Sequence, residues 1–137
     1  MSTLHAFLHP ASAEDILEVE VSKRFRDENG KAVPFKIRAV TQEENDLLVK
    51  RSMRPVKGGR RGEKELDGSL LSRRIVVAAT VEPDFTSEEL CRAYGVLDPL
   101  EVPGKMLLAG EFKKLSEEIM RLSGFDDAED LEEEAKN

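Results

Sequence analysis

Residues 16–24 read Ile-Leu-Glu-Val-Glu-Val-Ser-Lys-Arg and residues 33–40 read Val-Pro-Phe-Lys-Ile-Arg-Ala-Val, and these two stretches decide the fold. Apolar and charged side chains alternate in both, as in strands that bury one face. Residues 27–31 between them, Asp-Glu-Asn-Gly-Lys, are typical of a tight turn. We therefore expect an N-terminal β-hairpin whose inward-facing residues are Leu17, Val19, Val21, Phe35 and Ile37.

The register of this hairpin can be predicted from the same alternation. Odd-numbered residues line the inner face of both strands, so the loop must have an odd number of residues. A loop of residues 28–30, with Gly30 at positive φ, meets this requirement. The pairs that result join opposite charges: Asp27 with Lys31, and Glu20 with Arg38.

Helical patterns follow the hairpin. Apolar residues recur at helical spacing in several segments, two of which open with a Thr followed three residues later by Glu, the pattern of a capping box. The segments are residues 41–52, 69–81, 86–95 and 109–124. The predicted fold class is therefore α+β, with an N-terminal β-hairpin followed by a mostly helical single domain over residues 16–125.

Three other segments are expected to add little to the core. Residues 1–15 are predicted to be a disordered N-terminus, and residues 126–137 an acidic, frayed C-terminal segment. Residues 53–66 carry many Lys, Arg and Gly residues and few apolar ones. Since so little burial cannot offset the entropy lost on ordering, this segment is predicted to be a mobile basic loop.

The composition narrows the function. A formal net charge of −7 disfavours general attraction to nucleic acid or anionic lipid and favours protein partners. The single cysteine, Cys91, cannot form an internal disulfide, which suits a reducing cytoplasm. No signal peptide and no apolar run of membrane-spanning length is evident, so neither export nor membrane insertion is expected.

No group of residues predicts catalysis or a cofactor. His5 and His9 have the spacing of two metal ligands on a helix, but Pro10 follows and no Cys or carboxylate motif completes a site. Cys91 lacks a nearby His that could act as its base, because no His follows His9. We therefore expect a non-enzymatic protein without metal or cofactor, in which Cys91 is a small buried side chain.

The basic loop leaves an alternative open. Residues 58–62, Gly-Gly-Arg-Arg-Gly, lack the order of a phosphate-binding loop and follow no predicted strand. Basic, Gly-containing segments can nevertheless follow a nucleic-acid backbone. Nucleic-acid binding through residues 51–64 is therefore the alternative function, although the segment has no aromatic residue on which bases could stack.

Several landmarks along the chain together resemble one known family. They are the hairpin and the Glu pair after it (residues 18–44), Arg-Arg-Ile-Val-Val-Ala-Ala-Thr-Val-Glu-Pro-Asp (73–84), Leu90 to Val96, Met-Leu-Leu-Ala-Gly-Glu-Phe (106–112) and Leu-Ser-Gly-Phe (122–125). In this order they are similar to the XkdN-like phage tail assembly chaperones. The resemblance runs from about Glu18 to Phe125, nearly the whole chain.

The resemblance implies a helper protein in the cytoplasm of a bacterium that carries a phage or prophage. It would bind the tape measure protein, keep it soluble, leave it when tail tube subunits enclose it, and be absent from the finished particle. A homo-oligomer is compatible with this role, and a structural tail component kept in the virion is a further alternative. The hairpin and the helix around Ile75 are needed for the core, so the predicted partner-binding residues are Leu90, Tyr94, Met106 and Leu107.

Overall fold

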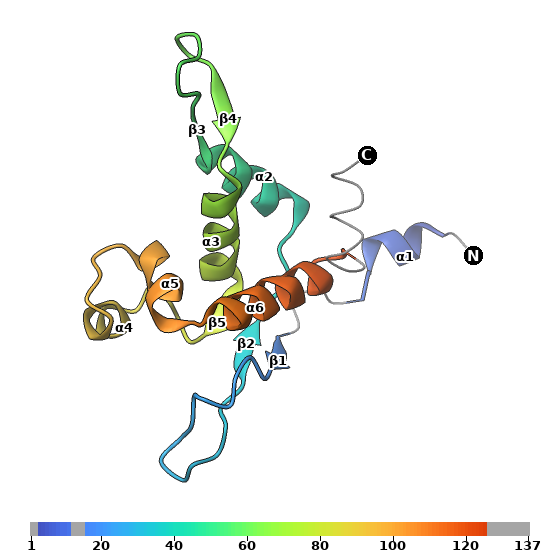
Figure 1. Ribbon diagram of the computed structural model, residues 1–137. Coiled ribbons are helices and arrows are strands. Elements are labelled where there is room, and N and C mark those ends of the chain that lie inside the picture. Colours follow the sequence, from blue (N-terminus) through green and yellow to red (C-terminus); the bar gives the residue numbers. More distant parts are fainter. Residues whose placement is uncertain (1–2, 12–15, 126–137) are drawn as a thin grey trace.

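The computed structural model describes residues 3–11 and 16–125 (Figure 1). Within the N-terminus predicted to be disordered, residues 1–15, it contains a short helix, α1 (Leu4–Leu8), none of whose residues is buried. The predicted acidic segment 126–137 lies outside the described residues. The α+β class and the N-terminal strands are confirmed.

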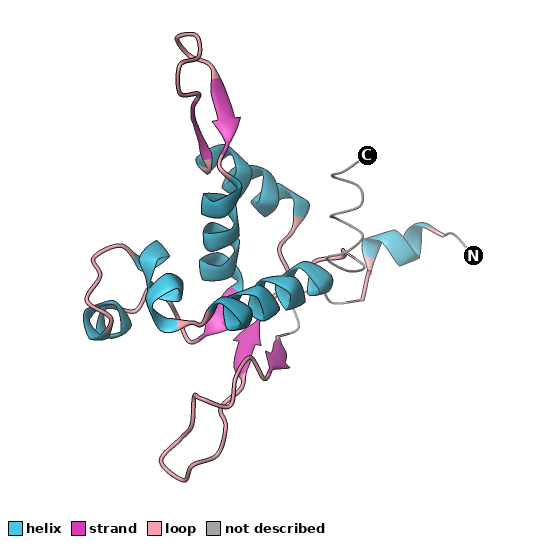
Figure 2. Ribbon diagram, in the orientation of Figure 1, coloured by secondary structure: helices cyan, strands magenta, loops and turns pink. Residues whose placement is uncertain are grey.

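The main sheet has three antiparallel strands in the order β1-β2-β5 (Figure 2). β1 (Leu17–Val19) and β2 (Phe35–Ile37) are the predicted hairpin strands, whereas β5 (Thr80–Glu82) was expected to be the end of a helix. The helix ends early because the carbonyl of Ala79 would need the N–H of Pro83, which proline lacks. That carbonyl instead accepts a hydrogen bond from the Arg38 backbone N–H at 2.9 Å, which joins the helix end to the sheet.

The hairpin has two registers. Near the turn the prediction holds, because the Asp27 N–H donates to the Lys31 carbonyl at 2.9 Å and Gly30 has a φ of 79°. Farther along, Glu18 pairs with Lys36, so the predicted pairing of Glu20 with Arg38 is wrong. The displacement between the two registers is an even number of residues, so each side chain keeps its predicted face.

Burial confirms four of the five inward-facing residues of the hairpin, and Leu17 is the exception. Leu17 is 42% exposed and starts β1, one of the two edge strands of the sheet. The four buried residues are Val19, Val21, Phe35 and Ile37.

Four helices lie close to their predicted positions, although α3 and α4 end two residues before their predicted ends, and α5 is an additional short helix. They are α2 (Gln42–Arg51), α3 (Gly68–Ala79), α4 (Glu88–Ala93), α5 (Val102–Met106) and α6 (Ala109–Leu122), with a 3₁₀ turn, η1 (Pro99–Glu101). Thr41 caps α2 as predicted, but the Glu44 carboxylate pairs with Arg38 instead of completing the box. Ser87, not Thr86, caps α4, because the Thr86 hydroxyl donates to Asp84.

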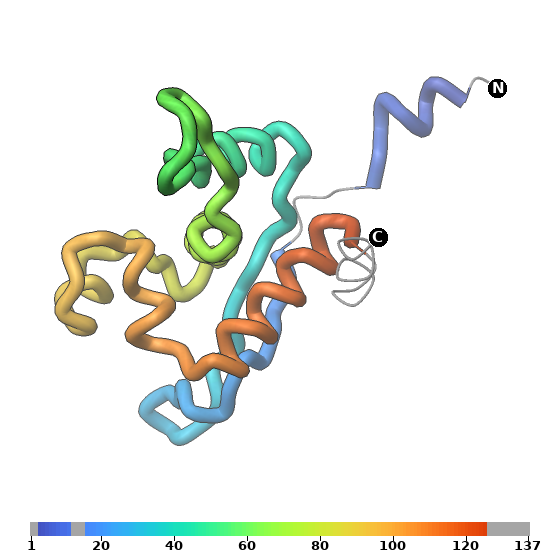
Figure 3. Tube along the Cα trace, turned by 45° about the horizontal axis from the view of Figure 1, so that its top comes forward, coloured from blue at the N-terminus to red at the C-terminus, as the bar shows by residue number. Residues whose placement is uncertain are grey.

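α3 is the centre of the fold. It contacts α2, α5, α6, η1 and β5, and Figure 3 views it nearly along its axis. The core joins the inner face of the sheet to the helices, and its largest fully buried side chain is Phe85, in the turn before α4. The buried apolar residues are Val19, Val21, Phe35, Ile37, Leu48, Ile75, Val76, Ala79, Phe85, Cys91, Val96, Val102, Leu107, Leu115 and Ile119.

The segment predicted as a basic loop, residues 53–66, contains a second, two-stranded antiparallel sheet. β3 (Met53–Pro55) pairs with β4 (Lys64–Leu66), and the hairpin projects away from the body of the protein (Figure 1). Its base is held by the buried Ser52, whose carbonyl accepts a hydrogen bond from the Asp67 N–H at 2.9 Å. The predicted basic loop therefore includes two short paired strands, and its mobility stays a prediction.

Candidate functional site

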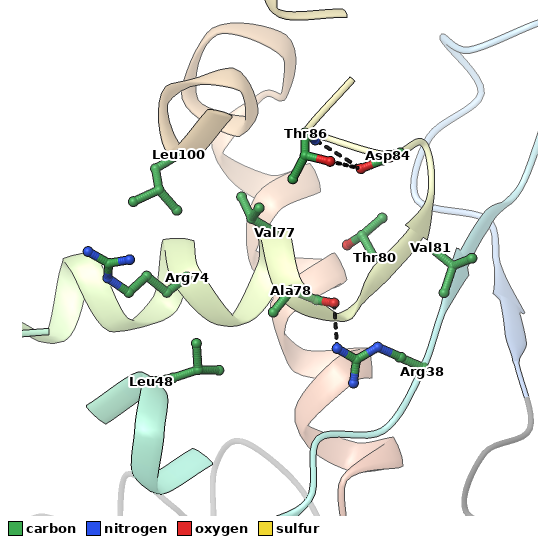
Figure 4. Close-up of a pocket in the computed structure, with 10 residues that line it drawn as sticks. All are labelled: Arg38, Leu48, Arg74, Val77, Ala78, Thr80, Val81, Asp84, Thr86 and Leu100. Atoms are coloured by element: carbon green, nitrogen blue, oxygen red, sulfur yellow. Dashed lines mark hydrogen bonds between the residues drawn. The ribbon is translucent and has the colours of Figure 1, made fainter. Parts of the chain in front are cut away.

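An open groove of about 440 Å³ crosses one side of α3 (Figure 4). We call it the α3 groove. Its lining comes from the end of β2, from α2, α3 and β5, from the turn after β5, and from η1. The lining residues are Arg38, Leu48, Arg74, Val77, Ala78, Thr80, Val81, Asp84, Thr86 and Leu100.

The middle of the α3 groove is apolar. Arg74, Val77 and Ala78 follow each other at the spacing that places side chains on one face of a helix. Leu48 of α2 and Leu100 of η1 lie on opposite sides of this stripe (Figure 4). A helix face with apolar side chains between two apolar walls is the kind of surface that receives another amphipathic segment.

The stripe is only partly buried, because α3 has more apolar surface than the core can use. Residues 75–79, Ile-Val-Val-Ala-Ala, are apolar on all sides of the helix. Ile75, Val76 and Ala79 are buried, whereas the other two residues of this run line the groove. Val81, at the end of the predicted helical segment 69–81, is 40% exposed, since β5 replaces the last helical turn there.

Two of the three charged groups in the groove are paired. The Arg38 guanidinium donates to both carboxylate oxygens of Glu44, at 2.8 and 2.7 Å, and to the Ala78 carbonyl at 2.8 Å. This pairing raises the pKa of Arg38 and lowers that of Glu44. The Asp84 carboxylate accepts from the Thr86 hydroxyl at 2.6 Å and the Thr86 N–H at 2.9 Å, which lowers the pKa of Asp84.

Arg74 differs from these two groups. Its Nε is buried without a hydrogen-bond partner, and the guanidinium forms no ion pair within residues 3–11 and 16–125. A buried donor without a partner is costly, so a partner carboxylate that reached it would be favoured. Its neighbour Arg73 also has a buried, unpartnered Nε but does not line the groove. The sequence analysis did not identify Arg74, and the only signal was a basic residue beside an unusually apolar run.

The predicted partner-binding residues lie outside the α3 groove. Leu107 is 9% exposed and belongs to the core, while the other three are half-buried and pack against it. Tyr94 and Leu90 are one helical turn apart, with the Tyr94 N–H donating to the Leu90 carbonyl at 3.1 Å. The Met106 carbonyl accepts a hydrogen bond from the Arg24 guanidinium at 3.1 Å. Whether these residues contact a partner stays a prediction.

The β3–β4 hairpin is basic but not uniformly so. Arg54 lies 3.7 Å from Glu65 and 3.8 Å from Asp67, and the Glu63 carboxylate accepts from the Arg60 N–H. Acidic groups thus share the surface with the basic ones. This mixture gives little support to the nucleic-acid alternative, which needs an uninterrupted positive track.

The described residues contain no group of three or more His, Cys, Asp or Glu side chains arranged to hold a metal ion. His5 and His9 lie exposed on α1 and after it, with ring centroids 4.6 Å apart. Cys91 is buried as predicted, and its thiol donates to the Phe85 carbonyl at 3.6 Å. Within the part of the chain that the structure describes, no helix has the length and apolar character needed to cross a membrane.

Comparison with known proteins gives consistent matches. Residues 4–136 match the family described as "Phage XkdN-like tail assembly chaperone protein, TAC". The chain is 42% identical over 130 residues to the phage-like element PBSX protein XkdN of Bacillus subtilis (strain 168). That match covers 91% of this chain and 86% of the relative. The chain is 45% identical over 130 residues to the uncharacterized protein YqbN of the same strain, and this match covers 91% of this chain and 85% of the relative.

A solved structure also resembles the fold. The crystal structure of the protein YqbN superimposes with a TM-score of 0.73 at 34% sequence identity. The match covers 88% of this chain and 96% of that chain. Sequence and fold thus agree over the same region.

Proposed function

This chain belongs to the phage XkdN-like tail assembly chaperone family, and we propose that it binds the tape measure protein and keeps it soluble during tail assembly. A long helical protein that is not yet enclosed by tail tube subunits exposes apolar stripes, and exposed stripes of this kind aggregate. A chaperone that covers them reversibly prevents this. The tail tube protein then displaces the chaperone, which is absent from the mature virion.

The observation that carries this proposal is the apolar stripe of α3 in the α3 groove. Its apolar residues, Val77 and Ala78, are half-buried and line the open groove between Leu48 and Leu100, although α3 is the most central helix of the fold. Binding requires no catalytic group, in keeping with a family of assembly factors. The compartment we propose is the cytoplasm of the bacterial host, where tails are assembled.

The half-buried surface formed by Leu90, Tyr94 and Met106 is proposed as a second contact area. Tyr94 combines an aromatic ring with a polar hydroxyl, which suits an interface that forms and dissociates and is therefore in water part of the time. Leu107, the fourth predicted residue, belongs to the core. Tyr94→Ala combined with Met106→Ala should reduce protection of the tape measure protein while the circular dichroism spectrum stays that of the folded chain.

The proposal is tested on two samples. In the first, an affinity-tagged form of this chain is purified from host cells during tail assembly. In the second, mature tails are purified and analysed for the tagged chain. We expect the tape measure protein of the same phage in the first sample and no tagged chain in the second. Recovery of the chain in mature tails would instead indicate a structural tail component. Nuclease-sensitive capture of nucleic acid, without tape measure protein, would indicate the nucleic-acid alternative.

A further inference from the structure

We propose that Arg74 selects the segment that the α3 groove binds, by pairing with a carboxylate on an amphipathic helix of the tape measure protein. This inference rests on the function proposed above and adds the chemistry of the bound segment. The segment would carry an Asp or Glu one helical turn from the apolar residues that enter the groove, since side chains three and four positions apart share a helix face.

The charges of the groove support this choice. Arg38 is neutralised by Glu44, and Asp84 is satisfied by Thr86. Arg74 is therefore the charged lining residue that lacks a partner within the described residues, and it lies at one end of the apolar stripe (Figure 4). A partner with a basic residue at that place would be repelled, and a neutral one would leave the Arg74 Nε buried and unpaired.

Apolar contacts would supply the other part of the recognition. Val77 lies one turn along α3 from Arg74, and Leu48 and Leu100 stand on either side of it. A helix placed along this stripe can bury apolar residues against all three while a carboxylate reaches the guanidinium. The apolar contacts then give affinity for many helices, and Arg74 restricts binding to those with an acidic residue in register.

The chain itself contains a competing occupant. Residues 126–137 begin directly after Phe125 and include Leu131 among Asp and Glu residues. Arg38 lines both the α3 groove and a second pocket, which Leu122 and Gly124 also line. We favour the tape measure protein because the pairing then contributes to the chaperone role, and the experiment below separates the two.

The experiment uses overlapping synthetic peptides that cover the tape measure protein of the same phage, and measures their affinity for the full-length chain. Arg74→Glu is compared with Arg73→Glu, a matched control on the same helix outside the groove. We expect the tightest peptides to be amphipathic and acidic. Their affinity should fall about tenfold or more for the Arg74→Glu chain and change little for the Arg73→Glu chain. A peptide whose Glu is changed to Arg should bind the Arg74→Glu chain better than it binds the wild-type chain.

Equal binding of all peptides to the Arg74→Glu, Arg73→Glu and wild-type chains would overturn the role of Arg74 and leave the proposed function intact. Failure of every peptide and of the whole tape measure protein to bind the wild-type chain would overturn the proposed function itself. A full-length variant with every Asp and Glu of residues 126–134 changed to Asn or Gln tests the competing occupant. If the effect of Arg74→Glu disappears in that variant, the chain's own acidic segment is the occupant and the inference is wrong.

Discussion

Arg24 and Glu111 form a two-pronged salt bridge between the β1–β2 connection and the first turn of α6. The Arg24 Nε and Nη2 atoms donate to the two carboxylate oxygens of Glu111 at 2.9 and 2.6 Å. Glu111 also accepts from the Leu108 N–H at 2.8 Å, which caps α6. The pair therefore joins the hairpin to the helix, at the point where the hairpin changes register.

This pair predicts a pH dependence. The hydrogen bonds from Arg24 lower the pKa of Glu111 to about 2, and its ordinary value is 4.5. Because the folded pKa is the lower one, the stabilisation is complete above the ordinary pKa and is lost as the pH falls towards about 2. Thermal unfolding followed between these pH values should show less acid destabilisation in Glu111→Gln than in the wild type.

The control for that experiment is Glu117→Gln. Glu117 lies 3.9 Å from Lys113 on α6, in a pair whose lysine is exposed and whose energetic value is small. This variant removes a carboxylate from the same helix but leaves the Arg24–Glu111 pair in place, so its melting temperature at neutral pH should stay close to that of the wild type. A Glu111→Gln pH profile that matches the wild type would contradict the assignment of the acid response to Glu111.

Val21→Asp should destabilise the domain. Val21 is 6% exposed, so an unpaired carboxylate there costs about 3 kcal/mol or more. Glu20→Ser, at the exposed neighbouring position, should change the free energy of unfolding by less than about 0.5 kcal/mol. Urea unfolding of both variants checks the assignment of the faces, and equal midpoints would refute it.

Phe85→Ala should be among the most destabilising single truncations. Its side chain is fully buried, so the expected loss is about 3–5 kcal/mol. Leu97→Ala, at a fully exposed leucine, should cost less than about 0.5 kcal/mol. Denaturant unfolding compares the two, and a Phe85 variant as stable as the Leu97 variant would mean that the turn before α4 does not pack as described.

The tip of the β3–β4 hairpin is expected to open easily and to be dispensable for folding. Residues 57–63 are exposed and bury little apolar surface. Trypsin should therefore cut the native chain first at Arg60 or Arg61, and a short Gly/Ser turn in place of residues 56–63 should leave the melting temperature nearly unchanged. Protease resistance at this site, or loss of folding after the replacement, would be evidence against this view.

Elements with strong local signals could be predicted from the sequence. The alternation in residues 16–24 and 33–40 identified the hairpin strands, and the Thr41 and Gly124 signals placed a helix start and a helix end. The face of each strand residue was largely right although the register was not, because an even displacement preserves the face. The register changes between Val19 and Arg26, in the segment where Arg24 contacts Glu111, a residue distant in sequence.

Features set by tertiary packing could not be predicted in this way. Phe85 lies in a turn, where no periodic pattern indicates burial. β5 forms where residues 80–82, which follow the end of α3, pair with β2, and the α3 groove depends on how η1 and α2 flank that helix. Arg74 could be recognised only from the structure, which shows that its buried Nε has no hydrogen-bond partner.

The central claim is tested most directly by the soluble fraction of the tape measure protein when it is expressed alone and together with this chain. The account predicts that the tape measure protein is largely insoluble alone, becomes soluble on co-expression, and elutes with this chain in size-exclusion chromatography. An unchanged soluble fraction, with no complex between the two proteins, would contradict the chaperone function.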